Sequence, residues 1–282
     1  MGIIKSSAYK IGYQVKLKFK ITLHSRDRFL LEQIKAYFGG VGKIYYDKRR
    51  KVCTYQVVST KDLTDVIIPH FEKFPLLTKK RADFELFKSV IELMHKKEHL
   101  TSGGLQKIVS IKALMNKRLS PDLQTKHTGC NPVSRPVVLI PENFEPNWLA
   151  GFITGDGCFL IDIKKGQTKT GFIVTLKVCI TQHSCDIELM KSLVTAFGCG
   201  RIESNAQGSI VNFVVTKFTC ITEKILPLLE KYPIQGVKAL DSADFCKVVY
   251  IMKVKGHLTT EGLEQIRKIK EGMNRKRSES PD

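Results

Sequence analysis

Apolar and polar side chains alternate in two segments that lie about 160 residues apart. In residues 13–22 the apolar positions are Val15, Leu17, Phe19 and Ile21. In residues 172–181 they are Val174, Leu176, Val178 and Ile180. A period of two is typical of a strand with one buried face. Each segment therefore predicts a half-buried β-strand.

The same series of periodic segments follows each predicted strand. In the first half we expect a helix at 28–38, strands at 43–46 and 52–58, and helices at 63–74, 81–96 and 102–116. In the second half we expect a helix at 187–197 and strands at 201–204 and 210–216. Strands grouped among helices in this order predict an α+β fold, in which an antiparallel sheet is backed by helices on one side.

The two halves also match residue by residue. Residues 21–27 match residues 180–186 at an offset of 159, and residues 99–101 match residues 257–259 at an offset of 158. Such runs indicate an internal repeat.

The repeat predicts two similar domains, at 1–119 and 148–277. Residues 120–147 have no counterpart and contain five prolines, so they are predicted to form the linker.

Composition indicates the class of partner. The chain has 46 Lys and Arg against 27 Asp and Glu, a formal net charge of +19. This excess favours a polyanion, most simply nucleic acid. No apolar run is long enough to cross a bilayer, and the first residues do not form a secretory signal. The eight cysteines include no Cys-x-x-Cys pair, which indicates free thiols in a reducing compartment rather than a zinc or disulfide framework.

Basic side chains gather on the polar face of the predicted strands. Lys16, Lys18 and Lys20 alternate with apolar residues, so they share one face. A lysine-rich solvent face is the simpler interpretation of one such strand, but the second half repeats the feature. A ribbon of this kind fits the DNA major groove, where lysines meet phosphates and Gln or Thr reads base edges. The other candidate DNA-binding residues are Gln14, Arg49, Arg50, Lys51, Lys164, Lys165, Thr175, Lys177 and Thr181.

Four histidines also recur between the repeats. His24 matches His183, and His99 matches His257. Because none has a second candidate ligand nearby in the pattern, we interpret them as structural residues rather than metal ligands.

Residues 148–159, Trp-Leu-Ala-Gly-Phe-Ile-Thr-Gly-Asp-Gly-Cys-Phe, form an apolar helix pattern of small residues that ends in one acid. Gly151 and Gly155 lie four apart and so share a helix face that another backbone can approach closely. Asp156 then stands at the helix end, where its carboxylate can reach a metal ion. Taken alone, the segment also fits a buried helix that ends at a glycine turn.

Residues 149–157 resemble the signature of the LAGLIDADG homing endonucleases, and the resemblance extends over residues 12–276. It implies two sheets that form a DNA-binding saddle with pseudo-two-fold symmetry, in a monomer that binds a long double-stranded DNA target. It also implies metal-dependent phosphodiester hydrolysis, with Mg²⁺ or another divalent cation as cofactor.

The resemblance assigns site residues as well. Asp156 and the Gly155 carbonyl would bind metal, Gln182 would order the attacking water, and Lys238, with Lys80 in the first repeat, would lie near a scissile phosphate. Leu23 stands at the counterpart of Gln182. The domain interface would include Leu149, Ala150, Gly151, Thr154 and Gly155.

The first repeat lacks its motif helix, because the offset of 159 places Leu160 opposite Met1. Two explanations stay open: the missing helix is encoded upstream, or the gene has decayed. Either way, we expect this chain to cut DNA poorly or to nick one strand. The unpaired face of the motif helix would favour self-association.

Two rival functions stay open at this stage. One is a maturase that helps its intron RNA to fold, and the other is a catalytically inactive DNA-binding protein. By analogy with organelle-encoded relatives, we expect a mitochondrial location.

Overall fold

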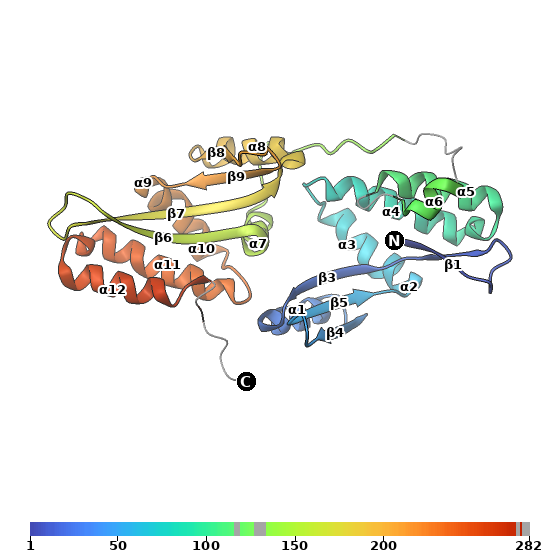
Figure 1. Ribbon diagram of the computed structural model, residues 1–282, viewed down its shortest axis with the longest axis horizontal. Helices are drawn as coiled ribbons and strands as arrows, with labels where there is room; N and C mark the ends of the chain where they lie inside the picture. Colours follow the sequence, from blue (N-terminus) through green and yellow to red (C-terminus); the bar gives the residue numbers. More distant parts are fainter. Residues whose placement is uncertain (116–118, 127–133, 275–276, 278–282) are drawn as a thin grey trace. The chain divides into compact units, whose positions relative to one another are not determined.

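The computed structural model describes residues 1–115, 119–126, 134–274 and 277. The chain divides into two compact units, residues 1–139 and 140–282 (Figure 1). We call them unit 1 and unit 2 and describe each by itself. The division falls inside the segment predicted as a linker, and that segment also contains a short helix, α6 (Pro121–Lys126).

Unit 1 contains two antiparallel sheets. The first pairs β1 (Gly2–Lys5) with β2 (Tyr13–Lys16), and the second has the order β3-β5-β4. Its strands are β3 (Phe19–His24), β4 (Lys43–Asp47) and β5 (Val52–Val57). The helices are α1 (Arg28–Tyr37), α2 (Thr60–Asp62), α3 (Ile68–Lys73), α4 (Lys80–His95) and α5 (Ser102–Leu114).

Unit 2 has one four-stranded antiparallel sheet of order β6-β7-β9-β8. Its strands are β6 (Gly157–Lys165), β7 (Phe172–His183), β8 (Arg201–Ser204) and β9 (Ile210–Val215). The helices are α7 (Pro146–Asp156), α8 (Ile187–Phe197), α9 (Phe218–Cys220), α10 (Leu226–Lys231), α11 (Lys238–Lys253) and α12 (Thr260–Glu271). Figure 1 shows α7 running directly into β6.

Each unit buries its own core between the sheet and the helices. In unit 1, Leu31 from α1 and Tyr55 from β5 are fully buried. In unit 2, Phe159, Phe213 and Phe245 come from β6, β9 and α11 and are buried in one cluster. The alternation in the strands therefore has its expected cause, with one face of each sheet on the core. These contacts confirm the α+β prediction of antiparallel sheets backed by helices.

One predicted strand of unit 1 is interrupted. The strand expected at 13–22 is two strands, β2 and β3, with Leu17 and Lys18 between them. Among the described residues, β2 pairs only with β1 and β3 only with β5, whereas β7 pairs with β6 and β9 and stays continuous. The exposure pattern continues through the interruption, since Leu17 is buried and Lys18 is exposed.

The first hairpins of the two units differ by one residue. Lys5 pairs with Tyr13, and Lys165 pairs with Phe172. The offset is therefore 160 on the first strand (165 − 5) and 159 on the second (172 − 13). Pairing places Gly2 at the position of Asp162, so the constant offset of 159 is wrong by one residue for β1.

Candidate active site at the end of α7

The helix α7 delivers Asp156 to a tight junction with the sheet. Glu145 caps the helix start, where its Oε2 accepts the Trp148 N–H at 2.8 Å, and Pro146 occupies the first turn. At the other end the Gly157 N–H bonds to the Ile153 carbonyl. A Cβ on Gly157 would stand 2.5 Å from that oxygen, so glycine is required there. Asp156 is consequently exposed at the last position of the helix.

Gln182 holds the Asp156 carboxylate. Gln182 lies near the end of β7, and its Nε2 donates to Asp156 Oδ2 at 2.6 Å. A carboxylate has about four acceptor positions, so one bond leaves room for others. This contact joins the end of α7 to β7.

Lys238 approaches the same helix end from α11, of which it is the first residue. Its Nζ donates to the Gly155 carbonyl at 2.9 Å and to the Ile153 carbonyl at 3.4 Å. The last carbonyls of a helix carry partial negative charge and attract cations. The preceding loop is fixed as well, because the Gln235 N–H bonds to Thr154 Oγ1 at 3.3 Å. The structure therefore brings Asp156, Gly155, Gln182 and Lys238 together within unit 2.

The oxygen atoms at this helix end fit a hard divalent cation. The donors are the Asp156 carboxylate and the Gly155 carbonyl, and Mg²⁺ in proteins is often held by one or two carboxylates with waters completing its shell. An ion on the Gly155 carbonyl would displace the Lys238 ammonium from that oxygen. Among the described residues no three His, Cys, Asp or Glu side chains form a metal-binding group. Burial, with a contribution from Cys179, raises the pKa of the nearby Cys158 thiol.

The residues expected at a domain interface differ in their surroundings. Gly151 and Gly155 are exposed, and a Cβ on either would meet no atom of the described chain within 4 Å. Ala150 is buried, and Thr154 Oγ1 donates to its carbonyl at 2.8 Å. Leu149 instead belongs to the core of unit 2, because it shares a helix face with Ile153.

The first-repeat counterparts lie in unit 1. Lys80 is the first residue of α4, as Lys238 is of α11, and it is exposed. Leu23 is in β3, half-buried, and packs at the margin of the unit 1 core. The equivalent of Gln182 therefore offers no polar atom.

The lysines of unit 1 share the exposed face of its strands. Lys16, Lys18 and Lys20 are exposed while the residues between them face the core. Gln14 is half-buried, and its Nε2 donates to the Tyr9 hydroxyl at 3.1 Å. Arg49, Arg50 and Lys51 form the exposed turn between β4 and β5, where Arg50 pairs with Asp47 at 2.7 Å.

The corresponding face of unit 2 contains acids that the sequence analysis did not anticipate. Lys164 pairs with Asp162 at 2.8 Å, and Lys177 with Glu203 at 3.4 Å. Lys165 and Thr175 are exposed, and Thr181 Oγ1 donates to Asn212 Oδ1 at 2.7 Å. Lys164 and Lys177 each have a carboxylate beside them, unlike the basic row of unit 1, and their assignment to DNA binding stays a prediction.

Two of the repeated histidines cap short helical turns. His24 Nδ1 accepts the Arg26 N–H at 3.4 Å, and His183 Nδ1 accepts the Cys185 N–H at 3.1 Å. These bonds support their structural interpretation. His99 and His257 are half-buried, and burial lowers the pKa of both imidazoles.

The sequence profile of the LAGLIDADG endonuclease family matches this chain twice, over residues 1–91 and 149–249. The second match includes the helix end with Asp156, Gln182 and Lys238. The chain belongs to the LAGLIDADG endonuclease family. Divalent-metal use is general in that family.

Two curated relatives that match most of this chain are longer than it is. Probable intron-encoded endonuclease 3 of Neurospora crassa is 39% identical over 93% of this chain and 49% of its own length. Probable intron-encoded endonuclease 2 of the same fungus is 36% identical over 96% of this chain and 61% of its own length. The chain therefore spans about half to three-fifths of these relatives.

Solved LAGLIDADG structures match nearly the whole chain. I-SmaMI bound to an uncleaved DNA target in the presence of calcium ions is 45% identical, with a TM-score of 0.92, over 97% of this chain and 93% of that chain. I-LtrWI bound to target DNA is 40% identical, with a TM-score of 0.95, over 98% and 93%. In the part of this chain that the structure describes, no helix has the length and apolar character needed to cross a membrane.

Proposed function

We propose that this protein is a homing endonuclease that binds double-stranded DNA at a specific sequence and hydrolyses phosphodiester bonds. The observation that carries the proposal is the cluster at the end of α7, where Gln182 bonds to Asp156 and Lys238 bonds to the Gly155 carbonyl. Family membership and the DNA-bound relatives support the same function.

Each residue of the cluster has a distinct proposed role. Asp156, with the Gly155 carbonyl, offers oxygen donors to a divalent cation. Gln182 orients the carboxylate through its Nε2 and presents its own carbonyl oxygen to the hydrogen of an attacking water. Lys238 places a positive charge beside the helix end, where it offsets the charge of a scissile phosphate. Lys80 would do the same from unit 1.

We propose Mg²⁺ as the cation. When bound, such an ion stabilises negative charge on the phosphate oxygens as a Lewis acid. The two protein oxygens suit it because Mg²⁺ retains much of its water shell. The presence of calcium ions in the uncleaved I-SmaMI complex supports a divalent-ion site in a relative.

The exposed strand faces are the proposed DNA-binding surfaces. In unit 1, Lys16, Lys18 and Lys20 would meet phosphates, and the turn formed by Arg49, Arg50 and Lys51 would extend the contact. In unit 2, Lys164, Lys165, Thr175, Lys177 and Thr181 would contribute. There the acids beside two of the lysines would reduce the positive potential.

We also propose that the protein acts in the mitochondrion. Support comes from a Podospora anserina protein described as lying in ND4 intron 1, which is 46% identical over 36% of this chain and 22% of its own length. The test fuses a fluorescent protein to the gene at its native locus and compares the distribution of its fluorescence with that of a mitochondrial dye.

The function is tested with a library of random-sequence DNA duplexes. The protein is first incubated with the library in Ca²⁺, and bound duplexes are sequenced. Enriched duplexes are then incubated with the protein in Mg²⁺ or in EDTA. We expect a defined sequence to be enriched and then cleaved or nicked only in Mg²⁺. Failure to enrich any sequence would contradict specific DNA binding, and enrichment without cutting would contradict the hydrolytic activity.

A further inference from the structure

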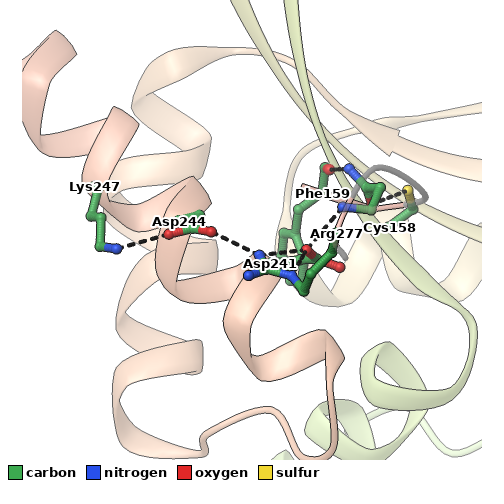
Figure 2. Close-up of polar contacts among 7 residues, drawn as sticks. Cys158, Phe159, Asp241, Asp244, Lys247 and Arg277 are labelled. Carbon is green, nitrogen blue, oxygen red and sulfur yellow. Dashed lines mark hydrogen bonds and ion pairs between the residues drawn. The ribbon is translucent and has the colours of Figure 1, made fainter. Parts of the chain in front are cut away.

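A buried polar network joins three separate segments of unit 2 (Figure 2). Asp241, in the first turn of α11, is 6% exposed. Its Oδ1 accepts the Arg277 Nε and Nη2 at 3.0 and 2.8 Å and the Asn274 backbone N–H at 2.9 Å. Arg277 Nη2 also bonds to Asp244 Oδ2 at 2.7 Å. The residues after α12 are thus tied to the start of α11.

Asn274 extends the network to the start of β6. Its Nδ2 donates to the Phe159 carbonyl at 3.0 Å, and the Cys158 thiol lies 3.6 Å from its Oδ1. Asn274 has a φ of 58°, a left-handed conformation that asparagine tolerates better than most residues. One residue therefore contacts both the α11 acid and the strand that begins directly after Asp156.

We infer that Asp241, Asn274 and Arg277 form a positioning clamp that sets Lys238 relative to Asp156. Lys238 lies three residues before Asp241 on α11, about one helical turn away. Cys158 and Phe159 follow Asp156 by two and three residues. The clamp therefore contacts α11 one turn from Lys238. It also contacts β6 within three residues of Asp156. This inference rests on the proposed function of that site.

The inner and outer parts of the network differ in burial. Removing a partner from a buried ion pair leaves an uncompensated charge, whereas an exposed pair contributes little. The Arg277 side chain is 19% exposed and that of Asp241 is 9%. Lys247, which pairs with Asp244 at 2.8 Å, is 63% exposed. Burial alone would raise the pKa of Asp244, but the bonds from Lys247 and Arg277 lower it overall. Lys247 is therefore a matched control in the same network.

In unit 1 the acid equivalent to Asp241 also pairs with an arginine, but that arginine comes from a non-equivalent position in the chain. Asp83 matches Asp241, and it pairs with Arg135 Nη2 at 3.0 Å. Arg135 also bonds to the carbonyls of Lys79 and Leu114. The position that matches Arg277 is Leu119 (277 − 158), which cannot make such a bond. Arginines at non-equivalent positions thus pair with the acid in the first turn of α4 and of α11. This recurrence indicates that both helices need a fixed first turn, where Lys80 and Lys238 lie.

The test measures single-turnover cleavage of the enriched duplex by Arg277→Gln, Arg277→Lys and Lys247→Gln, together with DNA affinity and melting temperature. We expect Arg277→Gln to slow cleavage by about 10- to 100-fold, since small misplacements of acting groups cost rates of this order. Affinity should stay close to that of the unchanged protein. Arg277→Lys should recover part of the rate, and Lys247→Gln should behave as the unchanged protein.

A double substitution separates positioning from general destabilisation. If the clamp acts through Lys238, Arg277→Gln should cause little further loss in a Lys238→Gln background, because the group it positions is absent. The inference would be overturned if Arg277→Gln slowed cleavage as much in the Lys238→Gln background as in the unchanged protein. It would also be overturned if Lys247→Gln slowed cleavage as much as Arg277→Gln does.

Amide hydrogen exchange tests the clamp without any cleavage. In Arg277→Gln, exchange at residues 157–160 and in the first turn of α11 should rise together, while Lys247→Gln leaves both unchanged. Unaltered exchange at either segment overturns the clamp. A protein that fails to cut DNA yet shows the coupled rise in exchange would instead overturn the proposed function alone.

Discussion

At the residue scale, the chemistry of the candidate site depends on one carboxylate and its orientation. Asp156 reaches solvent only because α7 ends there and Gly157 allows the chain to turn at once into β6. Gln182 then fixes one of its oxygens at 2.6 Å. A carboxylate held in this way loses little freedom when it binds a cation, so the site is preorganised.

Asp156→Asn should abolish cleavage and leave duplex binding intact. The amide keeps the shape of the side chain but loses the charge that holds a divalent cation. Since metal-ion catalysis contributes several kcal/mol, the rate should fall by about 100-fold or more. A Mg²⁺ nicking assay beside a gel shift measures both properties. Glu264→Gln, an exposed acid on α12, is the control and should leave both properties unchanged, whereas unaltered nicking by Asp156→Asn would exclude Asp156 as the metal-binding acid.

Two adjacent glycines in α5 should respond to alanine in opposite directions. A Cβ on Gly104 would lie 1.9 Å from the Glu98 carbonyl oxygen, whereas a Cβ on Gly103 would meet no atom of the described chain within 4 Å. Gly104→Ala should therefore cost about 1–3 kcal/mol or more of unfolding free energy. Gly103→Ala should stabilise the helix by about 0.5–1 kcal/mol. Urea denaturation measures both, and equal effects would contradict the close approach at Gly104.

At the element scale, the strands β2 and β3 carry a basic row that differs from its counterpart in unit 2. Replacing Lys16, Lys18 and Lys20 together with Gln should weaken DNA binding. If each contacts one phosphate, the slope of log K against log salt should fall by about 0.9 per lysine, or about 2.7 in all. The control replaces three exposed lysines of the unit 1 helices and turns, Lys61, Lys73 and Lys96. A slope that is the same in both variants would place the strand face away from DNA.

Most of the elements could be predicted from the sequence, because their patterns are local. The alternation around Val15 and Leu17 gave their burial correctly, and α8 has the predicted bounds. The interruption between β2 and β3 could not be predicted, since it depends on which neighbour each strand pairs with. The Lys177–Glu203 pair was missed for a related reason: β8 and β7 are linked only through β9.

Only part of the candidate site could be predicted from the sequence. Asp156 could be predicted because a distinctive helix pattern surrounds it. Gln182 and Lys238 were assigned by resemblance, and only the folded chain shows their contacts at 2.6 and 2.9 Å. The partnership of Asp241 with Arg277 carries no sequence signal, because 36 residues separate two common residue types.

At the scale of the whole molecule, the two cores are made of separate residues. All buried residues of one cluster lie in unit 1 and all those of the other in unit 2. Phe245→Ala should therefore lower the unfolding free energy of unit 2 by about 3–5 kcal/mol, while unit 1 keeps its stability. Hydrogen exchange resolved by peptide measures each unit separately. Leu31→Ala is the reciprocal variant and should affect unit 1; equal loss of protection in both units by either variant would show that they unfold together.

The two arginines that engage Asp83 and Asp241 limit how the halves of this protein can be exchanged with those of others. Arg135 precedes the end of unit 1 by only four residues, and Arg277 lies beyond the last helix of unit 2. A chimera whose junction is placed directly after α5 or α12 would cut away one of them and leave Asp83 or Asp241 without its arginine partner. Recombination of such halves, in the laboratory or in a genome, should therefore succeed only when the first half extends through Arg135 and the second through Arg277.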